Sequence, residues 1–141
     1  MSIEENKTIA RRFIEEVWNK GNVSFLNEIL TSDCVSHFTP SLKAVFRGPE
    51  EYKQAVSIFR TAFPDLHFAI EDLIAEGDKV ACYWIASGTS KGQYMNYAPT
   101  GKQMKQPGVT IFGLANGKIV SHIAIWDEIN GLRQTGIMPE A

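Results

Sequence analysis

The sequence predicts an α+β fold in which N-terminal helices pack on a curved, mainly antiparallel sheet. Apolar residues repeat at the three-four spacing of helices only before Pro64, and four strand-like runs follow that proline. Helices followed by a run of long strands are typical of α+β domains. With 141 residues, the chain is expected to form one domain over residues 1–141. A strongly curved sheet closed by helices is shaped like a cone, and the open end of a cone offers a pocket.

Three helices are expected before Pro64. The first ends at Gly21, and its apolar face is formed by Ile9, Ala10, Phe13, Ile14, Val17 and Trp18. A short second helix is expected over residues 23–30, followed by a brief strand at residues 33–38 and a loop at residues 40–47. The third helix begins at Pro49, which suits a first turn, and ends at Pro64.

Four strands are expected in the second half, over residues 67–75, 79–89, 102–114 and 118–127. Asn116-Gly117 is a strong hairpin signal between the last two of these strands. The connection over residues 90–101 carries Tyr94, Met95 and Tyr97, which is apolar for a loop. We therefore expect this loop to pack over another part of the molecule.

Composition and spacing argue against several classes of function. The formal net charge is -2 and no run of Lys or Arg is present, which disfavours nucleic-acid binding. No apolar stretch approaches the roughly 20 residues that span a bilayer. The charged, helix-like N-terminus does not resemble a signal peptide, so a cytoplasmic protein without membrane contact is expected. Cys34 and Cys82 are expected to be free buried thiols.

Metal and cofactor chemistry are not expected either. The three histidines lack the spacing of metal ligands. The sequence contains no glycine-rich phosphate loop, no nucleophile elbow and no dinucleotide-binding fingerprint. We therefore expect the chain to fold and act without a metal, a cofactor or a disulfide.

Asp127 is the first candidate for a chemical role. It follows an apolar strand-like run, SHIAIW, and precedes a plausible short helix. One interpretation is that the acid caps this helix and stays hydrated. The other is that Asp127 lies partly buried in a pocket wall beside Trp126, where it could remove a proton next to a carbonyl group.

His122 and His37 are candidate partners for this acid. Strict alternation along the strand puts His122 and Asp127 on opposite faces, so both would face one cavity only across a β-bulge. His122 could donate a hydrogen bond to an enolate oxygen, or it could be an ordinary core or outward-facing histidine. His37 ends the early strand, where it could polarise a substrate or simply be exposed.

Aromatic residues are numerous enough to line a pocket as well as to fill a core, and an aromatic wall suits a planar apolar ligand. Each is an ordinary core or loop residue by default. The residues that we expect to contact such a ligand are Phe13, Trp84, Phe59, Phe63, Phe112 and Tyr97.

Four stretches carry a resemblance to a known family, and they stand in this order: FIEEVWNKGNVSFLNEIL, RGPEEYKQAVSIFRTAFPDLHFAIEDLIAEGDKVACYW, GTSKGQYMNYAPTGKQM and NGKIVSHIAIWDEINGLRQTG. Together they cover most of the chain and resemble SnoaL-like polyketide cyclases of the nuclear-transport-factor-2-like superfamily. The resemblance implies a cone-shaped α+β barrel with a deep apolar pocket, often in a homodimer.

The same resemblance implies roles for particular residues. Family cyclases close a ring by an intramolecular aldol reaction with an Asp acid/base near the end of the last long strand, which is Asp127 here. A histidine at the place of His37 lines the pocket mouth in relatives. Family cyclases also present a histidine from the preceding strand, where this chain has none and instead carries Gln106, Pro107, Gly108, Val109 and Thr110.

Three interpretations from different classes remain open. The first is a cofactor-free acid/base enzyme of the cyclase, isomerase or dehydratase type, acting on a small apolar carbonyl compound through Asp127, His122 and His37. The alternative is a non-catalytic module that binds a hydrophobic metabolite in the same pocket. A third possibility is a structural dimer whose pocket is filled.

A homodimer paired through the outer face of the sheet is also expected. Ile85, Phe112 and Ile125 indicate that the sheet is apolar beyond the side that the helices cover. An apolar face of this kind is usually covered by another surface.

Overall fold

The computed structural model describes residues 2–39 and 44–139. Its helical elements are α1 (Ile3–Arg12), the π-helical η1 (Phe13–Asn19), η2 (Val23–Phe25), α2 (Leu26–Ile29), α3 (Gly48–Ala62) and α4 (Glu128–Gln134). Its strands are β1 (Leu30–Thr39), β2 (Ala44–Arg47), β3 (His67–Glu76), β4 (Lys79–Thr89), β5 (Gln103–Ala115) and β6 (Lys118–Trp126). None of the helices in the described part of the chain is long and apolar enough to cross a membrane.

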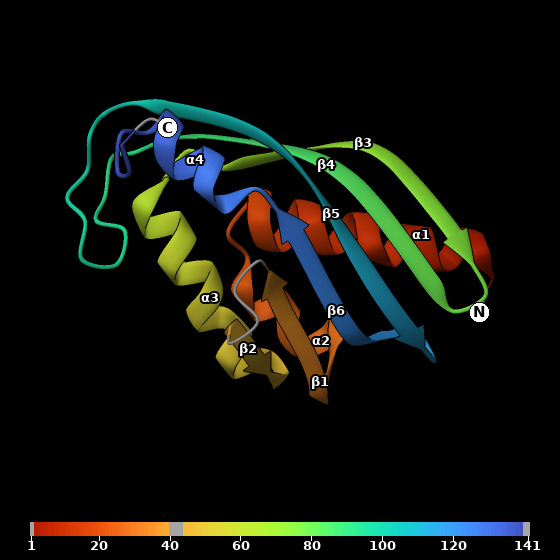
Figure 1. Ribbon diagram of the computed structural model, residues 1–141. Coiled ribbons are helices and arrows are strands. Elements are labelled where there is room, and N and C mark those ends of the chain that lie inside the picture. The colour runs from red at the N-terminus through yellow and green to blue at the C-terminus, as the bar shows by residue number, and fades with distance from the viewer. Residues whose placement is uncertain (1, 40–43, 140–141) are drawn as a thin grey trace.

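The strands form one six-stranded sheet in the order β2-β1-β6-β5-β4-β3. Every neighbouring pair is antiparallel except β1 and β6, which are parallel. The sheet curves around α1, η1 and α3 but does not close on itself (Figure 1). The predicted α+β class, with helices on one face of a curved and mainly antiparallel sheet, is confirmed.

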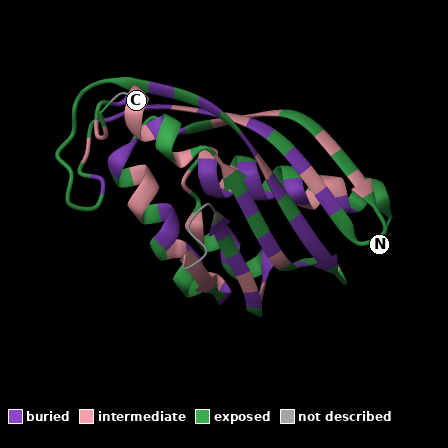
Figure 2. Ribbon diagram, in the orientation of Figure 1, coloured by how far each residue is buried: buried purple, intermediate pink, exposed green. Residues whose placement is uncertain are grey.

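Alternation along the strands separates a dry concave face from an exposed convex face (Figure 2). In β5, each even-numbered residue from Met104 to Leu114 is buried, while its odd-numbered neighbours are mostly exposed. In β4 the even-numbered residues from Val80 to Gly88 are also buried, and the odd-numbered residues between them are half-buried or exposed. Because successive side chains of a strand point to opposite faces, one face of the sheet is free to pack against the helices.

Aromatic rings fill the space between the concave face and the helices. Phe13 of η1 lies edge-on to Phe112 of β5 and to Tyr52 of α3, with ring centroids 5.3 and 5.4 Å apart. All three residues are completely buried. Phe112 therefore belongs to the core, and the expectation that it adds to an apolar outer face is wrong. Cys34 and Cys82 are buried and free, as predicted.

Two local features differ from the sequence prediction. Residues 44–47, predicted as part of a loop, form the edge strand β2, which pairs with the last residues of β1; the rest of that predicted loop, residues 40–43, lies outside the described residues. The first helix widens to a π-helix at residues 13–19, at the end of which Asn19 binds the backbone N–H and C=O of Phe68 at 2.7 and 3.0 Å. Both features depend on partners far along the chain, which local periodicity does not reveal.

Trp84 of β4 pairs with Gly108 of β5, and its indole ring lies over this glycine. A Cβ atom on Gly108 would meet the indole ring 2.2 Å away. We expect Gly108→Ala to lower the free energy of unfolding by about 1–3 kcal/mol, because the core must shift to admit the methyl group. Urea denaturation checks this, with the exposed Lys105→Ala on the same strand as a control that changes stability by less than about 0.5 kcal/mol. An unchanged midpoint for Gly108→Ala would contradict the packing described here.

Candidate functional site

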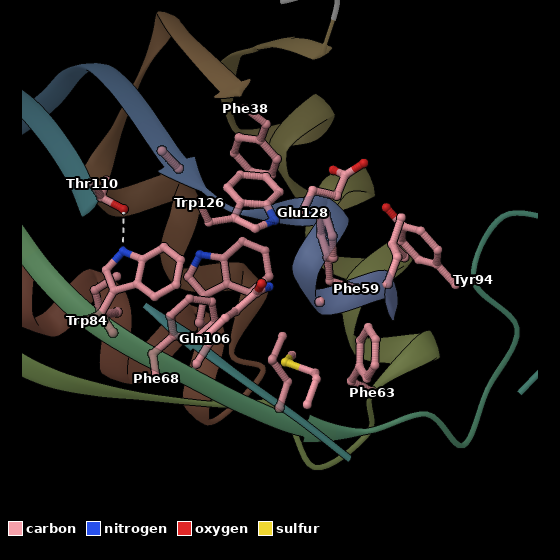
Figure 3. Close-up of a pocket in the computed structure, with 18 of the residues that line it drawn as sticks. Phe38, Phe59, Phe63, Phe68, Trp84, Tyr94, Gln106, Thr110, Trp126 and Glu128 are labelled. Atoms are coloured by element: carbon pink, nitrogen blue, oxygen red, sulfur yellow. Dashed lines mark hydrogen bonds between the residues drawn. The ribbon is translucent and has the colours of Figure 1, made fainter. Parts of the chain in front are cut away.

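A cavity lies inside the curve of the sheet, between its concave face, η1, α3 and α4 (Figure 3). Its empty space, together with the open solvent at its mouth, is about 740 Å³. The lining residues are Ile14, Trp18, Phe38, Tyr52, Phe59, Phe63, Leu66, Phe68, Trp84, Ala86, Tyr94, Met104, Gln106, Thr110, His122, Ala124, Trp126, Glu128, Gly131 and Leu132.

Aromatic rings from separate elements make the walls. Trp126, the last residue of β6, lies edge-on to Phe38 and Phe59, with centroid distances of 5.7 and 5.9 Å. On the opposite side, Phe68 and Trp84 pack edge to face at 4.7 Å. Walls of this kind suit a flat apolar ligand, because rings offer large contact areas with little loss of rotamer freedom.

Few polar groups reach this apolar space, and two of them come from β5. Thr110 accepts a hydrogen bond from Trp84 Nε1 at 2.9 Å. Gln106 is 7% exposed, and its Oε1 has no hydrogen-bond partner among the described residues. The Gln106 amide packs against Gly131 of α4, where a Cβ atom would lie only 2.8 Å from it. Burying an acceptor without a hydrogen-bond partner costs free energy.

Glu128, the first residue of α4, places a carboxyl group at the cavity wall near Tyr94 (Figure 3). Burial raises the pKa of Glu128 above its ordinary value. Burial, and then the charge of Glu128, raises the pKa of Tyr94 to about 12. The site therefore favours the neutral carboxylic acid more than water does.

Helix α4, which carries Glu128 and Gly131, is attached to the sheet through side chains. The Gln134 amide accepts from Lys105 N at 2.7 Å and donates to Lys105 O at 3.1 Å. Thr100 donates a hydrogen bond to the backbone oxygen of Thr135 just beyond the helix. These contacts hold the end of α4 against β5 and the loop that precedes it.

The family follows from a sequence comparison. A family model described as "SnoaL-like polyketide cyclase" matches residues 8–135. The chain belongs to this SnoaL-like family. A search of curated proteins found no match.

Solved structures agree with this membership. A protein from Acidithiobacillus ferrooxidans, provisionally named a polyketide cyclase, is 30% identical, with a TM-score of 0.82 over 97% of this chain and 99% of its own. One from Jannaschia sp. CCS1, provisionally named a SnoaL-like polyketide cyclase, is 23% identical, with a TM-score of 0.88 over 99% of this chain and 97% of its own. IdmH from Streptomyces antibioticus, also provisionally a polyketide cyclase, is 25% identical, with a TM-score of 0.81 over 93% and 98% of the two chains.

Within this SnoaL-like chain, Asp127 does not lie where the acid/base interpretation needs it. Its side chain is exposed, and it accepts a hydrogen bond from Asn130 N at 3.0 Å as the N-cap of α4. The expectation of a partly buried Asp127 in the cavity wall is wrong. β6 ends at Trp126, which takes the last inward position, and the chain then turns away into the helix.

The two histidines are placed differently from each other. His122 lines the cavity, is 2% exposed, and lies 3.2 Å from the hydroxyl of Tyr52 through Nε2. Burial lowers its pKa to about 3, so the ring is uncharged at neutral pH. His37 is exposed on the other face of the sheet, paired with the exposed Ile123, so its predicted place at the pocket mouth is wrong. No bulge brings Asp127 to the face of His122; the irregularity of the β5–β6 pairing lies at Gly113/Leu114.

Of the six aromatic residues predicted to contact a ligand, three line the cavity and three do not. Trp84, Phe59 and Phe63 line the cavity. Phe13 and Phe112 do not, because they are packed beneath it around the ring of His122. Tyr97 is half exposed, and the neighbouring Tyr94 takes the place in the wall instead.

Three functional candidates were not singled out from the sequence. Gln106 has the same parity on β5 as the buried residues around it, so strict alternation would have placed it inside. Tyr52 lies on the apolar stripe of α3 and has the pattern of an ordinary core residue. Glu128 follows directly after the capping acid, a position that gives no signal of burial.

In residues 2–39 and 44–139, no cluster of three or more His, Cys, Asp or Glu side chains could hold a metal ion.

The cap at Asp127 can be tested apart from any activity. We expect Asp127→Ala to lower the free energy of unfolding by about 0.5–2 kcal/mol, and Asp127→Asn to cost much less, because Asn caps helices about as well as Asp. Thermal and urea denaturation of the two variants measure this difference. Equal stability of Asp127→Ala and the parent protein would contradict the capping role.

Proposed function

We propose that this SnoaL-like chain is a cofactor-free acid/base enzyme of the cyclase, isomerase or dehydratase type, acting on a small, flat, apolar carbonyl compound. The observation that supports it most directly is the half-buried carboxyl group of Glu128 in the wall of an aromatic cavity. Asp127, one residue earlier, faces solvent, so we assign the acid/base role to Glu128 instead.

The chemistry that this arrangement supports is proton removal next to a carbonyl group. The Glu128 carboxylate takes a proton from the carbon next to the carbonyl group. The electron pair of the broken C–H bond forms a C=C bond, and the π electrons of the carbonyl group move to its oxygen to give an enolate. The aromatic walls hold the ring system flat and exclude water. The resulting acid can return the proton at another carbon, which gives isomerisation, or the enolate can attack a second carbonyl, which gives cyclisation.

One observation favours the alternative of a non-catalytic module for a hydrophobic metabolite. Burial raises the pKa of Glu128, and the neutral acid can donate a hydrogen bond to a bound carbonyl without any reaction. Both functions use the same cavity, and they differ only in whether a proton leaves carbon.

Hydrogen–deuterium exchange separates the two functions without knowledge of the natural substrate. The probe is 2-tetralone, a flat bicyclic ketone with exchangeable protons next to its carbonyl, followed by NMR in D₂O. We expect the protein to accelerate exchange and Glu128→Gln to lose about 10²-fold or more of that acceleration, as is typical of a lost general base. The rate should rise with pH through the raised pKa of Glu128 and then level off, because only the carboxylate accepts a proton.

Asp127→Asn is the matched control, since it changes the neighbouring acid and keeps a capping residue. It should retain the acceleration. Binding is followed in parallel with a fluorescent naphthyl ketone. A protein that binds this dye but does not accelerate exchange would favour the binding module, and loss of exchange in Asp127→Asn but not in Glu128→Gln would overturn the role of Glu128.

We further propose that two copies of the chain pair through the convex face of the sheet. Large apolar side chains are exposed there on neighbouring strands: Ile74 63%, Tyr83 42%, Ile111 37%, Ile123 38% and Ile125 49%. Ile111 pairs with Ile123 across β5 and β6, and Val109 joins Ile125 to Tyr83 in the adjacent row. Contiguous apolar surface of this kind is typical of a covered interface.

Light scattering at micromolar concentration tests the pairing. We expect the mass of a dimer for the parent protein and that of a monomer for Ile125→Asp, because a charge would be buried without a partner. Ile129→Asp is the control: Ile129 is 46% exposed but lies on α4, away from the sheet face, and should leave the dimer intact. A monomer mass for the parent protein would contradict the proposal.

A further inference from the structure

Tyr94 brings a phenol hydroxyl to the cavity from outside the sheet. It lies in the connection between β4 and β5, is 7% exposed, and packs on Phe59 and Phe63 of α3 with ring centroids 6.0 and 6.5 Å away. Tyr97, three residues later in the same connection, is 50% exposed and does not line the cavity. Of these two tyrosines, the fold therefore turns only Tyr94 inward.

Hydrogen bonds hold the backbone on both sides of Tyr94. Tyr94 and Tyr97 exchange both of their backbone hydrogen bonds across a tight turn, at 3.0 and 2.8 Å. Before them, the N–H groups of Lys91 and Gly92 each donate to the backbone oxygen of Ala62 at 3.1 Å, which ties this stretch to the end of α3. A donor that is fixed before the ligand binds costs little free energy to order.

The hydroxyl of Tyr94 is free of hydrogen bonds and can be reached by a ligand. No hydrogen bond joins it to another described residue. In the described part of the chain, the side-chain polar atoms that are both fully buried and unpartnered belong to Asn6, Gln106, His122 and Arg133. The Tyr94 oxygen is not one of these atoms, so it keeps accessible surface although the ring that carries it is buried.

Glu128, which places its carboxyl group in the cavity wall, is unpaired as well. It forms no hydrogen bond or ion pair with another described residue, and its oxygens are not fully buried. Glu128 and Tyr94 both lie at the end of the cavity away from Trp84 (Figure 3). The charge of Glu128 reaches Tyr94, since it is the second cause, after burial, of the raised pKa of that phenol. The two groups do not bond to each other, so one ligand can contact both.

We propose that Tyr94 is a further catalytic residue, whose O–H group donates a hydrogen bond to the carbonyl oxygen of the substrate while Glu128 removes a proton from the neighbouring carbon. This role rests on the function proposed above for Glu128. Negative charge grows on the carbonyl oxygen as the C–H bond breaks, and a donor already in place stabilises that charge. The phenol keeps its own proton at neutral pH, because burial and the charge of Glu128 raise the pKa of Tyr94 to about 12. A substrate held in this way points its apolar rings towards Phe68 and Trp84.

The hydrogen bond is tested first in the parent protein. The ¹³C NMR signal of tyrosine Cζ, the ring carbon that carries the hydroxyl, shifts when that hydroxyl donates a hydrogen bond. We expect 2-tetralone to shift the Cζ signal of Tyr94 more than tetralin does, because tetralin is the same bicycle without the carbonyl oxygen. Tyr83, on the convex face of the sheet, is the internal reference. Equal shifts of the Tyr94 signal with the two ligands, or no shift with 2-tetralone, would overturn the proposal.

Tyr94→Phe removes the hydroxyl and keeps the ring that packs on Phe59 and Phe63. We expect this variant to bind 2-tetralone about two- to tenfold more weakly, the range of one hydrogen bond, and to bind tetralin as tightly as the parent protein does. It should also lose about 10²-fold of the acceleration of exchange, as is typical of a lost donor to a developing oxyanion. Tyr97→Phe is the matched control, because it removes a hydroxyl from the same turn outside the cavity and should change neither quantity.

The outcomes separate the role of Tyr94 from that of Glu128. Exchange that is lost in Glu128→Gln but retained in Tyr94→Phe would overturn the role of Tyr94 and leave that of Glu128 intact. Equal weakening of 2-tetralone and tetralin by Tyr94→Phe would indicate a packing role and would also overturn the proposal. A parent protein that does not accelerate exchange would overturn both catalytic roles, and a loss of affinity for 2-tetralone alone in Tyr94→Phe would then assign the hydrogen bond to the binding module.

Discussion

The cavity depends on the alternation of β4, β5 and β6, which sends every second side chain to the concave face. That face must be dry enough to pack against helices, so most of its positions are apolar. Polar side chains placed among them are satisfied only where two of them meet, as Trp84 and Thr110 do. Gln106 Oε1 and His122 Nδ1 are both buried without a hydrogen-bond partner in the described residues.

Much of this arrangement can be predicted from the sequence because it follows from local rules. The change of period at Pro64 predicts the α+β class. Strict alternation predicts that Asp127 does not share the face of His122, and in the structure His122 is buried while Asp127 is exposed beyond the end of β6. The same rule predicts an inward-facing Gln106, because its parity on β5 matches that of the buried Met104 and Gly108. The stretches that resemble the SnoaL-like family predicted the membership that the family comparison then established.

The remaining features depend on contacts between distant parts of the chain. Asp127 and Glu128 are adjacent acids, and only the place where β6 ends decides that the first caps the helix and the second enters the wall. Phe112 and Tyr52 have the pattern of ordinary core residues, and their relation to His122 appears only when β5, α3 and β6 are brought together. A short apolar run such as residues 44–47 contains too little pattern to be distinguished from a loop.

Helix α4 carries the ionisable wall of the cavity, yet it takes no part in the hydrogen-bond ladder of the sheet. Its anchors are the cap at Asp127, the Gln134 amide on Lys105, and Thr100 on Thr135. A substitution at Glu128 can exchange the acid without changing any residue that pairs in the sheet. If Glu128 acts as proposed, the reacting acid therefore stands on an element outside the sheet, and a change of acid leaves the pairing of the strands intact.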